Sequence, residues 1–205
     1  MPRKKIHPIT AIDTRIRIPL HYQRQPLISR LVSRYGVRVN IKAAMLSATD
    51  SYGWFDLQLQ GKSQHIDDGL LYLHNLGVDL MHTGITEAMQ RNLGSRSFPR
   101  PRPEIPTPGI NYTYQFYGGQ SYRLGLQICI FKDYYQTPII FDLVSGYGIT
   151  VNIIGASLPA NQQEDGWFDL DLWGKPQQLF SSCDYLENLK LPLWLDASSL
   201  HGQII

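Results

Sequence analysis

The sequence predicts an α+β protein made of two ferredoxin-like (βαββαβ) sandwiches in tandem, each a four-stranded antiparallel sheet with two helices on one face. Three observations predict this fold: a long internal repeat, the same order of strand-like and helix-like patterns in both copies, and a proline-rich segment between them. We therefore expect domains over residues 10–82 and 119–198. Residues 83–118, first Pro-rich and then Tyr-rich, are expected to link them.

The internal repeat appears when the chain is aligned with itself. Residues 26–48 match residues 138–160 at an offset of 112, with 13 identities in 23 positions. After one residue inserted in the second copy, residues 53–76 match residues 166–189 with 13 identities in 24 positions. Solenoid units have only about 20–50 residues. Each copy is therefore expected to be a small domain with its own core.

The first half of each copy has a β-α-β-β pattern. In the first copy, residues 15–18 alternate basic and apolar side chains, as in a half-buried strand. A helix is expected from Pro26 to Gly36, because proline suits a first helical turn and glycine ends a helix. Alternation over residues 37–41 and again over 55–59 then predicts a hairpin.

The second half of each copy completes the unit. A helical stripe over residues 66–76 ends at Gly77, and residues 78–80 form a fourth strand. The second copy repeats this order element by element. Right-handed crossovers place both helices on one face of the sheet, so the opposite surface, here called the open face, is left without helices.

Composition argues against several classes of function. Lys and Arg number 19 against 17 Asp and Glu, so the net charge of +2 gives no general reason to expect nucleic acid as a partner. No apolar run reaches the roughly 18 residues that would span a membrane, and a cytoplasmic protein is expected. The six histidines and two cysteines lack metal-ligand spacing, and no nucleophile has an adjacent base. We expect no metal, no cofactor and no catalysis.

Strand alternation predicts which side chains lie on the open face. They include Trp54, Asp56, Trp167, Asp169, Trp173 and Trp194. Monomeric proteins rarely leave so much apolar area exposed, so these residues predict an interface. Two interpretations stay open: the linker, the other copy or a second chain covers them, or they form a ligand or partner site, with a carboxylate for an ammonium and an indole for an apolar group.

RNA-recognition motifs share this order of elements and stack bases on aromatic residues of the open face. Carboxylates at Asp56, Asp165 and Asp169 would repel phosphate. The sequence therefore favours a protein partner or self-association over RNA.

A short motif follows the first helix in each copy, Val39-Asn40-Ile41 and Val151-Asn152-Ile153-Ile154, and a Gly-aromatic strand follows it. With this motif the chain resembles the NIL domain, which is named for Asn-Ile-Leu at this point. Lys42 and Ile154 stand in place of the leucine. A free-standing tandem pair is similar to proteins of cyanobacterial type.

The resemblance implies a non-catalytic regulatory protein. NIL domains are best known as the C-terminal module of methionine-import ABC ATPases, where bound methionine inhibits transport and the motif Asn takes part in binding. This implies Asn40, Ile41, Asn152 and Ile153 as residues that bind an amino-acid-like ligand of the methionine class, or a protein. The alternatives are an interaction scaffold or assembly factor without a small ligand, and motif asparagines that only bond backbone. The sequence leaves open whether the copies pair within one chain or across a dimer.

Overall fold

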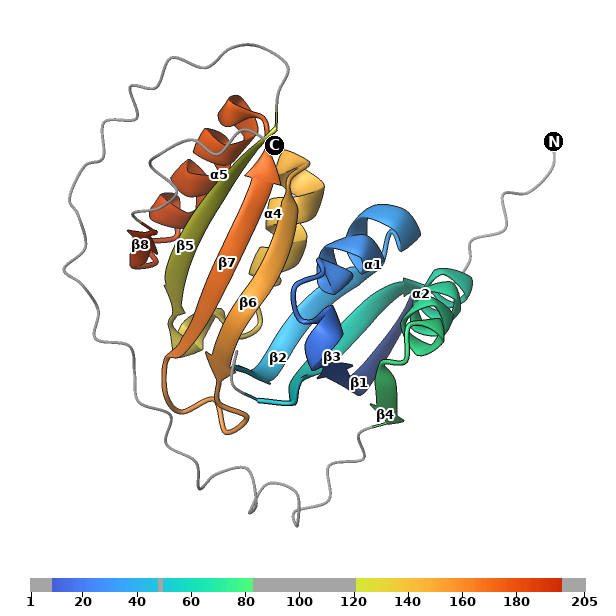
Figure 1. Ribbon diagram of the computed structural model, residues 1–205. Helices are drawn as coiled ribbons and strands as arrows, with labels where there is room; N and C mark the ends of the chain where they lie inside the picture. The colour runs from blue at the N-terminus through green and yellow to red at the C-terminus, as the bar shows by residue number, and fades with distance from the viewer. Residues whose placement is uncertain (1–8, 48–49, 83–120, 197–205) are drawn as a thin grey trace, which may run out of the picture.

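The computed structural model describes residues 9–47, 50–82 and 121–196 (Figure 1). The predicted linker over residues 83–118 lies outside the described residues.

Both copies have the predicted order of elements. The first copy consists of β1 (Ile9–Pro19), η1 (Leu20–Tyr22), α1 (Leu27–Tyr35), β2 (Arg38–Leu46), β3 (Tyr52–Lys62), α2 (Ser63–Asn75) and β4 (Asp79–His82). The second consists of β5 (Tyr122–Ile130), η2 (Lys132–Tyr134), α4 (Ile139–Tyr147), β6 (Thr150–Leu158), β7 (Gly166–Gly174), α5 (Pro176–Asn188) and β8 (Leu193–Leu195). Within each copy all strand pairs are antiparallel, which confirms the predicted ferredoxin-like sandwiches.

Glycine ends the first helix of each copy, as the sequence predicts. Gly36 and Gly148 have φ values of 63° and 65°, in the left-handed region that favours glycine. Pro26 and Pro138 lie directly before α1 and α4, one residue earlier than the first-turn position expected from the sequence. The proline before the helix and the glycine after it therefore place the motif strand at the same point in both copies.

The two four-stranded sheets join edge to edge into one eight-stranded sheet, in the order β4-β1-β3-β2-β6-β7-β5-β8. The junction is a short antiparallel pairing of β2 with β6, in which Met45 lies opposite Ser157. These two residues occupy equivalent positions of the repeat, 112 residues apart. A pseudo-twofold axis therefore passes between them, and the copies pair within one chain as two subunits of a symmetric dimer would.

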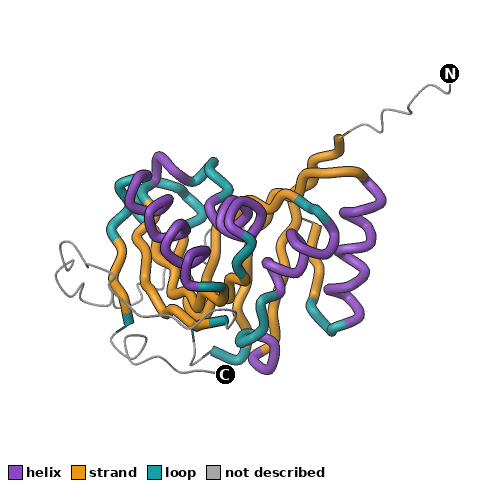
Figure 2. The backbone as a smooth tube through the Cα atoms, turned by 90° about the horizontal axis from the view of Figure 1, so that it is seen from above, coloured by secondary structure: helices purple, strands orange, loops and turns teal. Residues whose placement is uncertain are grey.

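The hydrophobic core is continuous across both copies, although the repeat predicts a separate core for each. Its buried residues include Ile16, Phe55 and Leu73 of the first copy and Ile128, Leu143 and Leu170 of the second. The cores merge because α1 packs on β6 as well as on its own sheet, and α4 packs on β2. Figure 2 shows the helices from above, with those of both copies approaching each other near the middle of the molecule.

A buried serine makes the contact between α1 and β6 specific. The Ser29 hydroxyl donates a hydrogen bond to the Val151 carbonyl at 2.6 Å and accepts one from the Val151 N–H at 2.8 Å. It thereby satisfies the backbone of β6 where that strand runs beyond its pairing with β2. The equivalent residue of the second copy is Phe141, whose ring lies 5.3 Å from the Arg38 guanidinium carbon. The two sides of the pseudo-symmetric junction thus use different chemistry.

Replacing Ser29 with Ala is expected to weaken the junction. The change leaves the Val151 N–H and carbonyl buried without partners, which costs about 1–3 kcal/mol of unfolding free energy. Denaturant unfolding followed by circular dichroism measures the loss. Ser145→Ala is the matched control, because the Ser145 hydroxyl is exposed and bonds a carbonyl of its own helix. Equal stability of the two variants would contradict the role given to Ser29.

Candidate functional site

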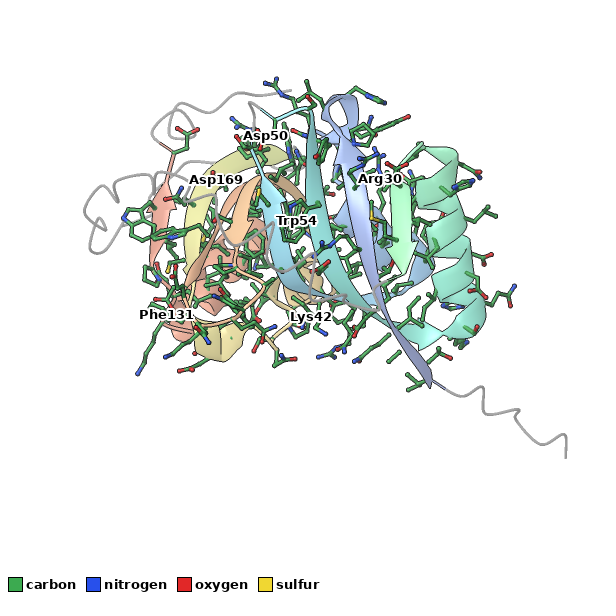
Figure 3. All side chains as sticks on the ribbon, turned by 90° about the horizontal axis from the view of Figure 1, so that it is seen from below. Arg30, Lys42, Asp50, Trp54, Phe131 and Asp169 are labelled. Carbon is green, nitrogen blue, oxygen red and sulfur yellow. The ribbon has the colours of Figure 1, made fainter. Side chains whose placement is uncertain are left out.

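The open face carries the side chains that alternation predicts. Phe55 pairs with Ile16 in the core, so its neighbours Trp54 and Asp56 project from the opposite surface, beside Arg17 and Arg15. The same register places Trp167, Asp169, Trp173 and Trp194 on the open face of the second copy. None of the four tryptophans belongs to the core cluster. Their role as a contact surface stays a prediction. Figure 3 looks onto this side from below and labels Trp54, Lys42 and Asp169.

On the first copy, charges of the open face pair within the chain. Arg15 forms two hydrogen bonds with the Asp56 carboxylate, at 2.5 and 2.6 Å, and its guanidinium carbon lies 4.4 Å from the centre of the Trp54 ring. Both Arg15 and Trp54 are only 9 % exposed. Lys42 pairs with Asp13 at 3.2 Å. The charges on the first copy's part of the open face are therefore largely neutralised by ion pairs within the chain.

The second copy is arranged differently at the equivalent positions. Asp169 accepts a hydrogen bond from the Gln127 amide at 2.6 Å, and within the described residues it forms no ion pair with Lys or Arg. Trp167 and Trp194 pack together, with ring centres 5.2 Å apart. The Trp194 indole nitrogen is buried without a hydrogen-bond partner.

The two motif asparagines are both buried but have different partners. Asn40 donates a hydrogen bond from Nδ2 to the Tyr135 carbonyl of the second copy at 3.0 Å. Asn152 is 6 % exposed, and its Oδ1 is buried without any hydrogen-bond partner. Buried polar atoms are nearly always satisfied, so an unpartnered amide oxygen marks a place where a donor is missing.

Space around Asn40 is small. A cavity of about 20 Å³ lies between β2 and the segment that precedes α4, and its lining includes Asn40, Ile41, Tyr135 and Pro138. This volume suits one water molecule rather than an amino acid. A hollow of about 530 Å³ lies at the surface by α4 and α5 and contains none of the predicted site residues.

The motif isoleucines face away from the open side. Ile41 pairs with Leu57, and Ile153 pairs with Leu170, and all four are buried in the core. A β-bulge follows each of them, at Lys42 and at Ile154. The two isoleucines can affect a site only indirectly, through the position of the strand. The asparagines lie on the opposite side of the sheet, where Asn40 is paired with Gln58 and Asn152 with Asp171.

An ion pair lies beside Asn152. The register places Asn152 opposite Asp171, and the Asp171 carboxylate accepts a hydrogen bond from Arg123 Nε at 2.9 Å. This hydrogen bond raises the pKa of the Arg123 guanidinium, so Arg123 keeps its positive charge over the whole physiological range. The first copy has Gln58 and Ala11 at these positions. The sequence analysis did not identify Arg123 as a site residue. The difference between Arg123 and Ala11 at equivalent positions of the repeat is the signal that could have identified it.

Together these groups suit a zwitterion. The Asn152 oxygen and the Asp171 carboxylate can accept hydrogen bonds from an ammonium, and the Arg123 guanidinium can donate to a carboxylate. Among the described residues, no group of three or more His, Cys, Asp or Glu could hold a metal ion. None of the helices in the described ranges is long and apolar enough to cross a membrane.

Comparison with known families decides what the chain is related to. The NIL domain model matches it twice, at residues 13–81 and 125–193. The chain belongs to the NIL domain family. This confirms the resemblance carried by the Val-Asn-Ile motifs, and it places both motif strands inside the matched ranges.

Two similar curated proteins come from cyanobacteria. The uncharacterized protein ssr2439 of Synechocystis sp. is 39 % identical over 72 residues, which cover 35 % of this chain and 74 % of that protein. The uncharacterized protein Synpcc7942_1683 of Synechococcus elongatus is 32 % identical over 74 residues, covering 36 % of this chain and 89 % of that protein. Each of these matches therefore has about the length of one copy, whereas this chain is a tandem pair.

Among solved structures, the crystal structure of a protein named as a glycine cleavage system transcriptional repressor is similar at a TM-score of 0.31 and 12 % identity, covering 92 % of this chain and 96 % of that one. A likeness at this level says nothing about function.

The phenol of Tyr135 predicts how stability depends on pH. Burial, followed by the nearby Asp165 carboxylate, raises the pKa of Tyr135 above its ordinary value of 10.0. The unfolded chain therefore releases this proton first, so the stability contributed below about pH 10 is lost as the pH rises further. Tyr135→Phe is expected to flatten the fall in melting temperature as the pH rises above about 10.

The same variant should be less stable by about 1 kcal/mol at pH 7, because it loses the hydrogen bond from the Tyr135 hydroxyl to the Glu164 carbonyl. Tyr52→Phe is the control, since Tyr52 is 50 % exposed. An alkaline fall as steep in the Tyr135 variant as in the wild type would show that this phenol does not titrate in the way described.

Proposed function

We propose that the chain is a non-catalytic regulatory protein that binds one small amino-acid-like ligand, of the methionine class, at the motif strand of its second copy. The observation that carries the proposal is the buried Asn152 oxygen without a partner, beside the ion pair of Asp171 and Arg123. Membership of the NIL family supports a regulatory binding role.

The ligand class follows from the charges. An α-amino acid carries an ammonium with three donors and a carboxylate with two acceptor oxygens. In this proposal the ammonium donates hydrogen bonds to the Asn152 oxygen and the Asp171 carboxylate, and the Arg123 guanidinium donates to the ligand carboxylate. Such charge-assisted hydrogen bonds are about twice as strong as neutral ones, which favours a zwitterion over an uncharged ligand.

One ligand per chain follows from the difference between the copies. Asn40 is occupied by the Tyr135 carbonyl, and the cavity beside it holds no more than a water molecule. The first copy also lacks the charged pair, because Gln58 and Ala11 stand at its positions. The first motif therefore acts within the junction between the copies, and the second motif contacts the ligand.

Isothermal calorimetry with methionine tests the proposal. The wild-type chain is expected to bind methionine with a stoichiometry near one, and Asn152→Ala is expected to weaken binding at least about tenfold, the cost of one charge-assisted hydrogen bond. Asn40→Ala is the matched control and should keep its methionine affinity while losing stability, because its side chain bonds the Tyr135 carbonyl.

The control also separates the proposal from its rival. Two bound methionines per chain, or equal loss in the Asn40 and Asn152 variants, would contradict a single site in the second copy. No heat with methionine or related amino acids, together with a stable protein partner, would favour a scaffold without a small ligand.

A further inference from the structure

The two copies differ in one row of residues across the open face. In the first copy this row runs from Met81 through Arg15 to Asp56 on adjacent strands. Arg15 is held by Asp56 and stacks on Trp54, so a guanidinium from the chain itself lies between a carboxylate and an indole. This arrangement shows what the Trp and Asp of the repeat can hold.

The second copy keeps the carboxylate and the indole but has lost the cation. Gln127 stands at the position of Arg15, and it gives Asp169 one amide hydrogen bond in place of an ion pair. Two other cations on the open face of the first copy are replaced as well: Lys42 corresponds to Ile154, and Arg17, which lies opposite Trp54, corresponds to Cys129. Met81 is replaced by Trp194, which packs on Trp167. The row therefore has more aromatic surface and one uncompensated carboxylate.

We propose that Trp167, Trp194 and Asp169 form a second binding site, which takes an arginine side chain presented by a partner protein. The guanidinium stacks on the indole pair and donates hydrogen bonds to Asp169, as Arg15 does on Trp54 and Asp56. The guanidinium lies on the outer surface of the two indoles, because ring centres 5.2 Å apart leave no room for it between the rings.

Charge and exposure favour this occupant. The three side chains are half-buried, so they are within reach of a partner. A carboxylate repels anions, and indole faces attract cations, with guanidinium the most frequent partner in proteins. The site shares no residue with the methionine site, because Asp169 and Asp171 lie two residues apart on β7, about 7 Å along the strand.

A capped tripeptide, acetyl-Gly-Arg-Gly-amide, is the probe, and its citrulline analogue is the uncharged control of the same shape. Indole N–H signals in NMR spectra report on each tryptophan separately. The arginine peptide is expected to move the signals of Trp167 and Trp194 and to leave Trp54 in place, because Arg15 already covers Trp54. The citrulline peptide should bind at least about tenfold more weakly.

Two further variants make the test reciprocal. Asp169→Asn removes the charge with little change of shape and should weaken the arginine peptide about tenfold without affecting methionine, whereas Asn152→Ala should do the reverse. Arg15→Gln with Met81→Trp gives the first copy the row of the second, and the arginine peptide should then also move the Trp54 signal. Thermal unfolding checks that each variant folds.

Equal binding of the arginine and citrulline peptides would overturn the proposal, as would full affinity in the Asp169→Asn variant. A second copy of the chain is the other candidate occupant. A wild-type dimer that Trp167→Ala converts to a monomer would assign the surface to self-association and would equally overturn the proposal.

Discussion

The short antiparallel pairing of β2 with β6 is the contact on which the rest of the structure depends. A ferredoxin-like unit alone would leave β2 as an exposed edge, and such edges invite uncontrolled pairing. Joining the two edges around Met45 and Ser157 closes both at once. It also brings α1 onto β6 and α4 onto β2, so two small cores become one. The interior gains size, which small domains need for stability.

Covalent linkage let the two halves of this junction diverge. In a dimer of identical chains every contact occurs twice, so a residue cannot serve one side only. Here Ser29 bonds the backbone of β6 while its counterpart Phe141 lies against Arg38. Asn40 and Asn152 differ in the same way, since one has a carbonyl partner and the other does not. The proposed single ligand site is a consequence of that asymmetry.

Local patterns sufficed to predict the fold of each copy, because periodicity, prolines and glycines determine where elements begin and end. Strand parity at Trp54 and Trp167 was also predictable, since both precede a core phenylalanine in an unbroken alternation. The shared core was not, because nothing in one copy's pattern says which edge the other copy meets. The different hydrogen bonding of Asn40 and Asn152 could not be predicted either. The Val-Asn-Ile tripeptide is identical in both motifs, and Tyr135, whose carbonyl is the partner of Asn40, is distant in sequence.

The mirrored strand order also determines how far the connecting segment has to reach. β4 is the first strand of the sheet and β5 the seventh, so at roughly 4.8 Å between neighbouring strands the chain has to travel about 29 Å sideways. About nine extended residues could cover that distance. Nothing in the β2–β6 pairing requires the two copies to share a peptide backbone. The tether raises the effective concentration of one copy near the other, and cutting it would make assembly depend on protein concentration while leaving the geometry of the contact intact.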